Sequence, residues 1–391
     1  MTAPVARAGL EEAVAILSEL VAFDTESSKS NLAFVAWVEA YLRGLGIEPL
    51  RVSNASGDKA AIFATIGPAR DGGVVLSSHS DVVPVEGQPW TSDPFRLRRA
   101  DGRLYGRGTC DMKGFVAICL AMAAQWRNMP LQKPLHLLIS YDEETTCLGP
   151  LDTIAKFGRD LPRPGAVIVG EPTMMQVVDA HKAVATYRTI VTGREAHSSK
   201  PALGVNAVEA ACELVHELYR IGRDIGGQGI AAERFDPPVS TVHVGTISGG
   251  TARNILAREC SFHWEFRALP GIDIDMAHKR LNAYAQDILL PRLRANAPEA
   301  NIVTQTEIEV PGLAPEPGSA AESLTLHLTQ SNRTHAVAFA TEGGRFQQAG
   351  LPTIVCGPGS IDQAHQPDEF ISEEQMVEGL AFMGDLGRHS C

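Results

Sequence analysis

The stretch VVLSSHSDVVPV, residues 74–85, starts as a buried strand and then becomes polar. Residues 74–76 form the apolar run that is typical of a strand covered on both faces. His79 and Asp81 follow where such a strand would end. Ligands of open parallel sheets bind beyond the carboxyl ends of the strands. An imidazole and a carboxylate at this point therefore indicate a functional site.

The residues around this stretch alternate between helix and strand patterns. Apolar residues recur at helical spacing in residues 10–23, 31–46 and 114–126. Short apolar runs that suit buried strands occur at residues 60–67, 73–78, 135–141 and 165–172. Such alternation predicts an α/β domain with a mostly parallel central sheet.

The pattern changes near residue 180. Longer, partly alternating strands are predicted at residues 183–193, 239–248, 260–269 and 301–310, with helices near 205–221 and 275–290. The order strand, helix, strand, strand, helix, strand is that of a ferredoxin-like α+β domain. We therefore expect the α/β domain over residues 1–179 and 313–391, interrupted by an inserted domain over residues 180–312. A capping-box pattern from Ser372 to Gln375 opens the last helix.

The composition excludes several classes of partner. The net charge of −12 argues against nucleic acid, because the general field of the protein would repel a polyanion. The longest apolar run, near residue 115, is too short to span a membrane, and the N-terminus lacks the apolar core of a signal peptide. The seven cysteines contain no CxxC pair, so neither a disulfide framework nor a thiolate zinc site is indicated. We expect a soluble protein in the reducing cytoplasm.

Acidic residues and a second histidine lie near the ends of other predicted strands, including an apolar run at residues 352–356 before His365, whereas Asp111 lies just before the predicted helix at 114–126. In a parallel sheet these ends share one edge, which would gather the side chains Asp111, Glu143, Glu144, Glu171 and His365. Carboxylates crowded in this way repel one another and raise one another's pKa values. Divalent cations remove that conflict, and zinc accepts both imidazole and carboxylate ligands.

A count of ligands is consistent with two zinc ions. Three protein ligands for each ion make six positions. His79, Glu144, Glu171 and His365 supply four of these positions, and Asp111 supplies the other two by bridging both ions. Taken singly, a histidine at a strand end or a Glu-Glu pair in a turn is as well explained by ordinary structural roles.

Two further residues are expected to support the metal ligands. Residues i and i+2 of a strand face the same side, so Asp81 can accept the second N–H of His79 and fix its tautomer. Glu143 and Glu144 are adjacent, so their side chains diverge. One of them, Glu143, can stay free of metal and act as a general base.

Five segments, in order along the chain, resemble the signatures of the M20 family of metallopeptidases and deacylases: SSHSDVVPV, GRGTCDMKG, DEETTCLG, GEPT and CGPGSIDQAHQPDEF. The resemblance implies a zinc-peptidase-like domain with an inserted lid, through which two chains form a homodimer. It implies one zinc on His79, Asp111 and Glu171 and another on Asp111, Glu144 and His365, with cobalt able to replace zinc. It also implies a cis peptide after Asp111.

Three residues of the expected lid also match the family. His197, in GREAHSSKP, resembles the histidine that reaches across the dimer to stabilise the developing oxyanion. Asn254 resembles a polar lid residue near the substrate. Arg267, in FHWEFRALPG, resembles an arginine that is suited to bidentate capture of an α-carboxylate. Read alone, each of the three is more simply a surface or structural residue.

Within the family, the C-terminal signature and the loop TEGGRFQQAGLPT resemble those of acetylornithine deacetylases. Glu342 lies where succinyl-diaminopimelate desuccinylases have a Ser-Gly-Gly-type loop, and we expect it to pair with the substrate's side-chain ammonium. Arg345 departs from the deacetylase loop, which is apolar there. The expected reaction is hydrolysis of N2-acetyl-L-ornithine to L-ornithine and acetate in arginine biosynthesis.

Three alternatives remain open from the sequence. The chain could be another M20 acylase, such as a succinyl-diaminopimelate desuccinylase, an aminoacylase or an acetylcitrulline deacetylase. It could be a carboxypeptidase or dipeptidase of the same family. A binding protein without activity is disfavoured, because Glu143 and all five metal positions are present.

Overall fold

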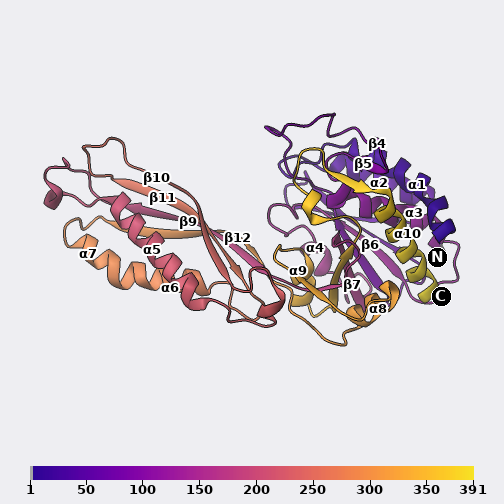
Figure 1. Cartoon of the computed structure of the whole chain (residues 1–391). Helices are drawn as coiled ribbons and strands as arrows, with labels where there is room; N and C mark the ends of the chain where they lie inside the picture. Colours follow the sequence, from indigo (N-terminus) through magenta and orange to yellow (C-terminus); the bar gives the residue numbers. More distant parts are fainter. Residues whose placement is uncertain (1–2) are drawn as a thin grey trace. The chain divides into compact units, whose positions relative to one another are not determined.

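The computed structural model describes residues 3–391, with side chains from residue 9 onwards, and divides into two compact units (Figure 1). The first unit runs to Ala180 and includes Pro315–Ala336 and Thr341–Cys391. The second unit consists of His181–Ala314 and the short segment Val337–Ala340. The predicted domain boundaries, 179/180 and 312/313, lie one and two residues before the main unit boundaries. The short segment was not anticipated.

The first unit is built on an eight-stranded sheet. Its strands, in spatial order, are β1 (Leu50–Ser53), β2 (Ala60–Ile66), β6 (Leu135–Ser140), β3 (Val74–His79), β7 (Ala166–Pro172), β14 (Thr353–Gly357), β8 (Val178–His181) and β13 (His335–Val337). The four strands β6, β3, β7 and β14 are parallel, and β1, β2 and β8 pair antiparallel on either side of them. The predicted α/β fold with a mostly parallel centre is confirmed.

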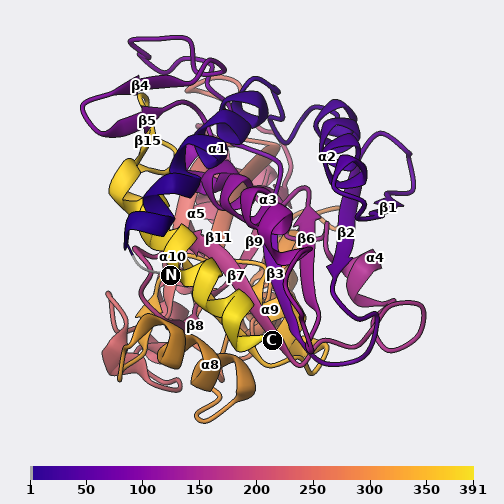
Figure 2. The ribbon, with the colours of Figure 1, turned by 90° about the vertical axis from the view of Figure 1, so that its right-hand side faces the viewer.

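Helices cover one face of this sheet. They are α1 (Ala3–Val21), α2 (Leu32–Gly44), α3 (Gly114–Trp126) and α10 (Glu373–His389). Their apolar side chains form one core with alternate residues of the strands, for example Ile62, Leu76 and Ile168. Helices α1, α3 and α10 lie side by side (Figure 2), and nearly every residue of α3 is buried, which explains why its sequence lacks a polar face.

A second, three-stranded sheet joins distant parts of the first unit. Strand β15 (Phe370–Ser372) pairs antiparallel with β5 (Arg103–Tyr105), which pairs with β4 (Arg98–Ala100). Ser372 caps α10 by accepting the N–H of Gln375, as predicted, whereas the Gln375 side chain accepts the N–H of Gly359 instead of closing the capping box. This small sheet brings the segment after His365 against the segment before Asp111.

The second unit has the predicted ferredoxin-like order. Strands β9 (Ala183–Thr192), β10 (Thr241–Gly249), β11 (Glu259–Ala268) and β12 (Asn301–Val310) form an antiparallel sheet in the order β10-β11-β9-β12. Burial alternates along β9, as expected when one face of a sheet is covered and the other is not. The covering helices are α5 (Ala207–Ile225), α6 (Met276–Tyr284) and α7 (Leu290–Arg294), the last two joined by a π-helical turn.

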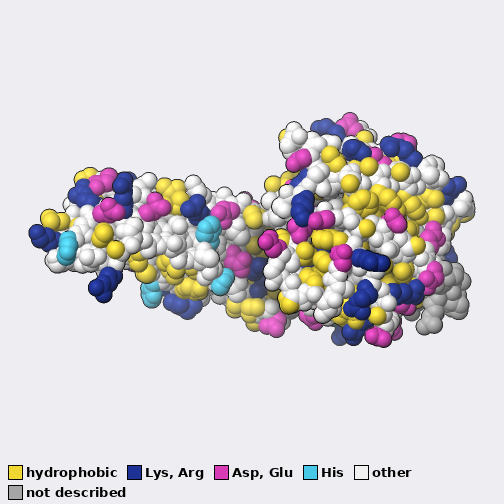
Figure 3. Space-filling model, turned by 90° about the horizontal axis from the view of Figure 1, so that it is seen from above, with side chains coloured by type: hydrophobic (Ala, Val, Ile, Leu, Met, Phe, Trp, Pro, Cys, Tyr) yellow, Lys and Arg dark blue, Asp and Glu magenta, His cyan; other side chains and the backbone are white. Residues whose placement is uncertain are grey.

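The surface carries mixed charge. Acidic and basic side chains are interspersed on the face that Figure 3 shows. Among residues 3–391, no helix is both long and apolar enough to cross a bilayer.

Candidate metal centre

The predicted acidic cluster comes together at the carboxyl ends of the parallel strands. His79 is the last residue of β3, and Glu171 lies near the end of the neighbouring strand β7. The Nε2 atom of His79 is 3.1 Å from Oδ1 of Asp111 and 3.7 Å from Oε1 of Glu171. Asp111 lies in the turn before α3, and the peptide bond that follows it is cis.

The second histidine approaches the same carboxylate from the other side. His365 Nε2 is 2.9 Å from Oε2 of Glu144 and 3.4 Å from Oδ2 of Asp111. The two oxygens of Asp111 therefore face two different histidines. A carboxylate placed in this way could hold one metal ion at each of its oxygens. The Asp111 side chain is 7% exposed, whereas that of His365 is 50% exposed.

Two overlapping groups offer ligand atoms within 4.8 Å of one another: His79, Glu143 and Glu171, and His79, Asp111 and Glu144. The two sets of three ligands implied by the family resemblance differ from these groups, because they leave out Glu143 and add His365. The structure thus brings all six residues into one cluster, including Glu143, which we expected to stay free of metal.

The Asp81 side chain contacts more than His79. The Nδ1 atom of His79 lies 2.9 Å from the main-chain oxygen of Asp81 and 3.6 Å from its carboxylate. That carboxylate accepts hydrogen bonds from the hydroxyl of Ser27 and from the backbone N–H groups of Glu143 and Glu144. Strand β3 ends at His79, so the strand alternation behind our prediction does not reach Asp81. Asp81 holds the Glu143–Glu144 turn in place.

Glu143 is held by a residue that the sequence analysis did not single out. The thiol of Cys147 donates to Oε1 of Glu143 at 3.3 Å, while Oε2 lies 3.9 Å from Nε2 of His79. Cys147 has a positive φ of 50°. The guanidinium of Arg345 donates to the main-chain oxygens of Thr146 and Cys147 and fixes this turn.

Glu342 lies under the strand ends. Its side chain is buried and accepts hydrogen bonds from the hydroxyls of Ser77, on β3, and Ser140, on β6. The serine at position 77, which interrupts the apolar run of β3, therefore has a buried partner. Burial raises the pKa of the Glu342 carboxyl to about 7.

The polar residues predicted for the lid fall into two places in the second unit. His197 pairs with Ile255 in a short antiparallel bridge, and Ser198 donates to the main-chain oxygen of Asn254 at 3.0 Å. His197 and Asn254 are thus neighbours on exposed loops, at the end of the sheet where β9 finishes and β11 starts.

Arg267 lies at the other end of the same sheet. It is opposite Val184, at the start of β9, and donates to Glu265 at 2.9 Å. Strand β11 has 10 residues. At ~3.4 Å per residue, its two ends are roughly 30 Å apart. Within one chain, Arg267 therefore lies far from His197 and Asn254.

All residues of the cluster fall within residues 75–389, which match the model of peptidase family M20/M25/M40. The chain belongs to this family. Among solved structures, aminopeptidase PepT from Bacillus cereus is 18% identical, with a TM-score of 0.75 over 96% of this chain and 98% of that chain. Human carnosine dipeptidase 1 is 15% identical, with a TM-score of 0.74 over 99% and 98%. The Bacillus subtilis YXEP protein, described as a dinuclear metal binding peptidase of the M20 family, is 13% identical, with a TM-score of 0.62 over 97% and 98%. At these identities the likeness concerns the fold.

The donor set of this M20 hydrolase fits metal ions. Oε1 of Glu171 is buried without a hydrogen-bond partner. Burial raises the pKa of Glu144 to about 7, and burial with the charges of neighbouring carboxylates raises the pKa of Glu171 well above its usual range. Hydrogen bonds to Asp111 and Glu144 raise the pKa of His365 to about 10. Cations would relieve the crowding of these carboxylates.

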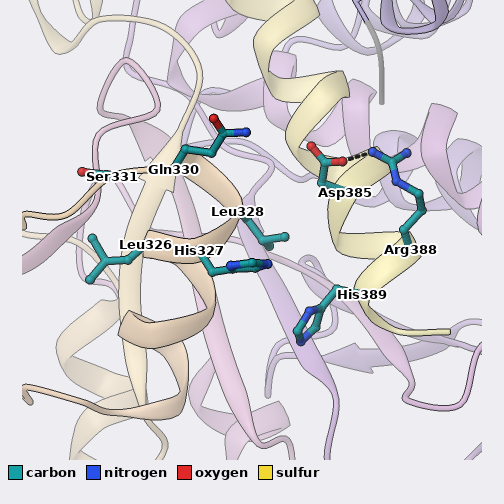
Figure 4. A pocket seen from close by; sticks show the side chains of 8 residues that line it. All are labelled: Leu326, His327, Leu328, Gln330, Ser331, Asp385, Arg388 and His389. Carbon is teal, nitrogen blue, oxygen red and sulfur yellow. Dashed lines mark ion pairs between the residues drawn. The ribbon is translucent and has the colours of Figure 1, made fainter.

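A separate cavity of about 690 Å³ lies between helix α8 (Ala320–Thr329) and α10 (Figure 4). Its histidines, His327 and His389, and its ion pair, Asp385–Arg388, lie near helix C-termini, where basic side chains stabilise the helix ends. A neighbouring cavity that shares His389 is lined by the first residues of β3 and β7. Both cavities are therefore at the opposite end of the sheet from His79.

Metal binding by this M20 hydrolase should strengthen as the pH rises from 6 to 8. A raised pKa means that Glu144 still holds its proton at a pH where a free glutamate has lost it, and His365 remains protonated throughout this range. Metal ligands must be deprotonated, so bound ions displace these protons. We expect the apparent zinc affinity to rise about tenfold per pH unit for each proton displaced. Zinc titration against a competing chelator at pH 6, 7 and 8 would measure this, with the chelator alone as control. Equal affinity at pH 6 and pH 8 would contradict it.

Proposed function

We propose that this M20 hydrolase converts N2-acetyl-L-ornithine and water into L-ornithine and acetate, as a step of arginine biosynthesis. The observation that carries hydrolysis is the position of Asp111, whose two oxygens lie 3.1 Å from His79 and 3.4 Å from His365. The choice of acetylornithine rests on the resemblance of the loop at residues 341–353 and of the C-terminal signature to acetylornithine deacetylases. A reducing, cytoplasmic setting is part of the proposal, since all seven cysteines are free thiols.

The cofactor proposed is two zinc ions per subunit, which cobalt could replace. His79, Asp111 and Glu171 would hold one ion, and Asp111, Glu144 and His365 would hold the other. When bound, the ions supply positive charge that polarises the scissile carbonyl and lowers the pKa of a water to ~7. Glu143 remains as the carboxylate of the cluster that can exchange protons.

Glu143 would act as general base and then as general acid. One oxygen of Glu143 is fixed by Cys147, and the other faces the cluster, 3.9 Å from His79. Burial and the charges of nearby carboxylates, opposed by His79, raise the pKa of Glu143 well above its usual range. A raised pKa makes the Glu143 carboxylate a stronger base toward the attacking water than a free glutamate is. The proton that Glu143 takes from this water goes to the amine nitrogen as the C–N bond breaks.

The second unit would bind the substrate. We propose that Arg267 holds the α-carboxylate, that His197 donates a hydrogen bond to the developing oxyanion, and that Asn254 contacts the substrate nearby. Arg267 and His197 lie toward opposite ends of one sheet, roughly 30 Å apart. One substrate could meet both residues only if they came from two chains, which supports a homodimer formed through this unit.

The decisive experiment is acetate release from a panel of N-acyl amino acids and dipeptides by zinc-loaded protein. We expect acetylornithine to have the highest kcat/KM, above acetylmethionine, acetylcitrulline, succinyl-diaminopimelate and dipeptides. As the matched control, Glu143→Gln should bind zinc as the parent does but lower kcat by ~10²–10⁴-fold, since it removes the positioned base. A higher kcat/KM for another substrate of the panel would contradict the acetylornithine assignment and indicate that substrate's class instead. Full activity of Glu143→Gln would overturn the mechanism.

Glu342 is proposed to favour a substrate that carries an ammonium group. Its buried carboxylate accepts hydrogen bonds from two serine hydroxyls. A cation that approached it would favour its charged form. We expect Glu342→Gln to reduce kcat/KM for acetylornithine about tenfold more than for acetylmethionine, as for one hydrogen bond to a charged group. An unchanged ratio between the two substrates would assign Glu342 a structural role only.

The action of His197 across two chains can be tested by mixing inactive variants. Glu143→Gln and His197→Ala chains should each be nearly inactive alone. After denaturation and refolding together, about a quarter of the parent activity should return, because half of the random dimers are mixed and each holds one complete site. Mixing two batches of Glu143→Gln provides the control. If the mixture regains no activity while the parent refolds fully, His197 does not act in the partner's site.

A further inference from the structure

Glu369 is a buried carboxylate that binds the main chain around Asp111. Its residue is 1% exposed. One oxygen accepts the N–H groups of Cys110 at 2.8 Å and Asp111 at 3.0 Å. The other accepts the N–H of Gly108 at 2.9 Å and the guanidinium of Arg107 at 2.8 Å. Four donors thus converge on one side chain, and three of them are backbone groups of the turn that carries Asp111.

Arg107 extends this network toward the second histidine. Its side chain is 1% exposed and donates to Oε1 of Gln88 at 2.5 Å. The Gln88 amide donates in turn to the main-chain oxygen of His365 at 2.9 Å. His365 has a positive φ of 62°, a conformation that a non-glycine residue adopts only when its surroundings hold it there. The contacts of Gln88 and Arg107 therefore help to fix a loop that would otherwise relax.

A buried ion pair of this kind is costly to maintain. Two charges removed from water are compensated only when the geometry is good and the remaining donors and acceptors are filled. Here the carboxylate has its donors, but Nε of Arg107 has no hydrogen-bond partner. An apolar residue in place of Glu369 would leave the backbone N–H groups of Gly108, Cys110 and Asp111 without their acceptor, so the carboxylate is what holds this turn.

We infer that Glu369 is a positioning residue for the metal centre. It fixes the main chain of Asp111 directly and that of His365 through Arg107 and Gln88. This inference rests on the proposed two-metal function. Asp111 serves both metal positions, but His365 serves only the one that it shares with Asp111 and Glu144. Glu369 therefore sets the affinity of this second position more than that of the position on His79 and Glu171, whose side chains it does not contact.

The test is stepwise zinc binding by the full chain, followed by competition with a chelator. The parent should take up two ions. Glu369→Gln keeps the size of the side chain but places an amide NH₂ against N–H donors, so the turn must shift. We expect the affinity for one of the two ions to fall ~10–100-fold, the cost of removing a supporting residue around a metal. The affinity for the other ion should change by less than about threefold.

Two further variants make the result specific. Gln88→Ala leaves the contacts of Glu369 intact but removes the acceptor of Arg107 and Trp90 and the link to His365, so it should weaken the same ion to a smaller extent. Glu373→Gln, four residues further along, removes a partner of Arg99 on the surface and should leave both affinities unchanged. A thermal unfolding curve of each metal-free protein shows whether the variant is folded.

The outcomes separate the inference from the proposed function. Fewer than two ions bound by the parent would overturn the two-metal proposal itself. Two ions in the parent with unchanged affinities in both Glu369→Gln and Gln88→Ala would overturn the positioning role alone. Equal losses at both positions in the two variants would also overturn it, because they would indicate general loosening of the fold.

Discussion

The contact on which the site depends is that of one buried carboxylate, Asp111, with two imidazoles. His79 comes from a strand and His365 from a loop near the end of the chain, yet each lies within 3.4 Å of a different Asp111 oxygen. The parallel strands bring one histidine to the sheet edge, and the pairing of β15 with β5 brings the other. The surrounding groups hold the segments that make this contact in place. Asp81 ties down the Glu143–Glu144 turn, and Glu369 ties down the turn of Asp111.

The buried carboxylates of the first unit fall into two kinds. Glu369 is neutralised by Arg107, and Glu342 is solvated by serine hydroxyls, so the protein itself satisfies both. By contrast, no lysine or arginine in the described part of the chain forms an ion pair with Glu143, Glu144 or Glu171. Burying ionised groups without compensation costs several kcal/mol or more. The histidines His79 and His365 face these three carboxylates, and in the proposed mechanism Glu144 and Glu171 bind cations while Glu143 stays free to exchange protons.

Much of this could be predicted from the sequence, because the decisive signals are local. Strands β2, β3, β6, β7 and β14 are apolar runs, and each metal-ligand candidate lies at or after the end of such a run, or, like Asp111, just before a helix. Strands β4, β5 and β15, with sequences RRA, RLY and FIS, lack that signal because they are short and only partly buried. Glu369 could not be told from its neighbour Asp368, because its partners are backbone groups that only the folded chain brings together. The same holds for Cys147, whose thiol reaches Glu143 through a turn with positive φ.

In the proposed mechanism the first unit holds the metal ions and the general base, and the second unit supplies the groups that contact the substrate. Every residue proposed to hold metal or transfer a proton belongs to the first unit, whereas His197, Asn254 and Arg267 belong to the second. A fold of this kind can change its substrate by altering groups in the second unit without disturbing the metal ligands. This explains why the metal-binding motifs in the sequence indicate the type of reaction more firmly than they indicate the substrate. The exception is Glu342, which sits beneath the metal cluster. The negative charge of Glu342 raises the pKa of Glu143. A substrate ammonium group bound at Glu342 would therefore also change the pKa of the general base.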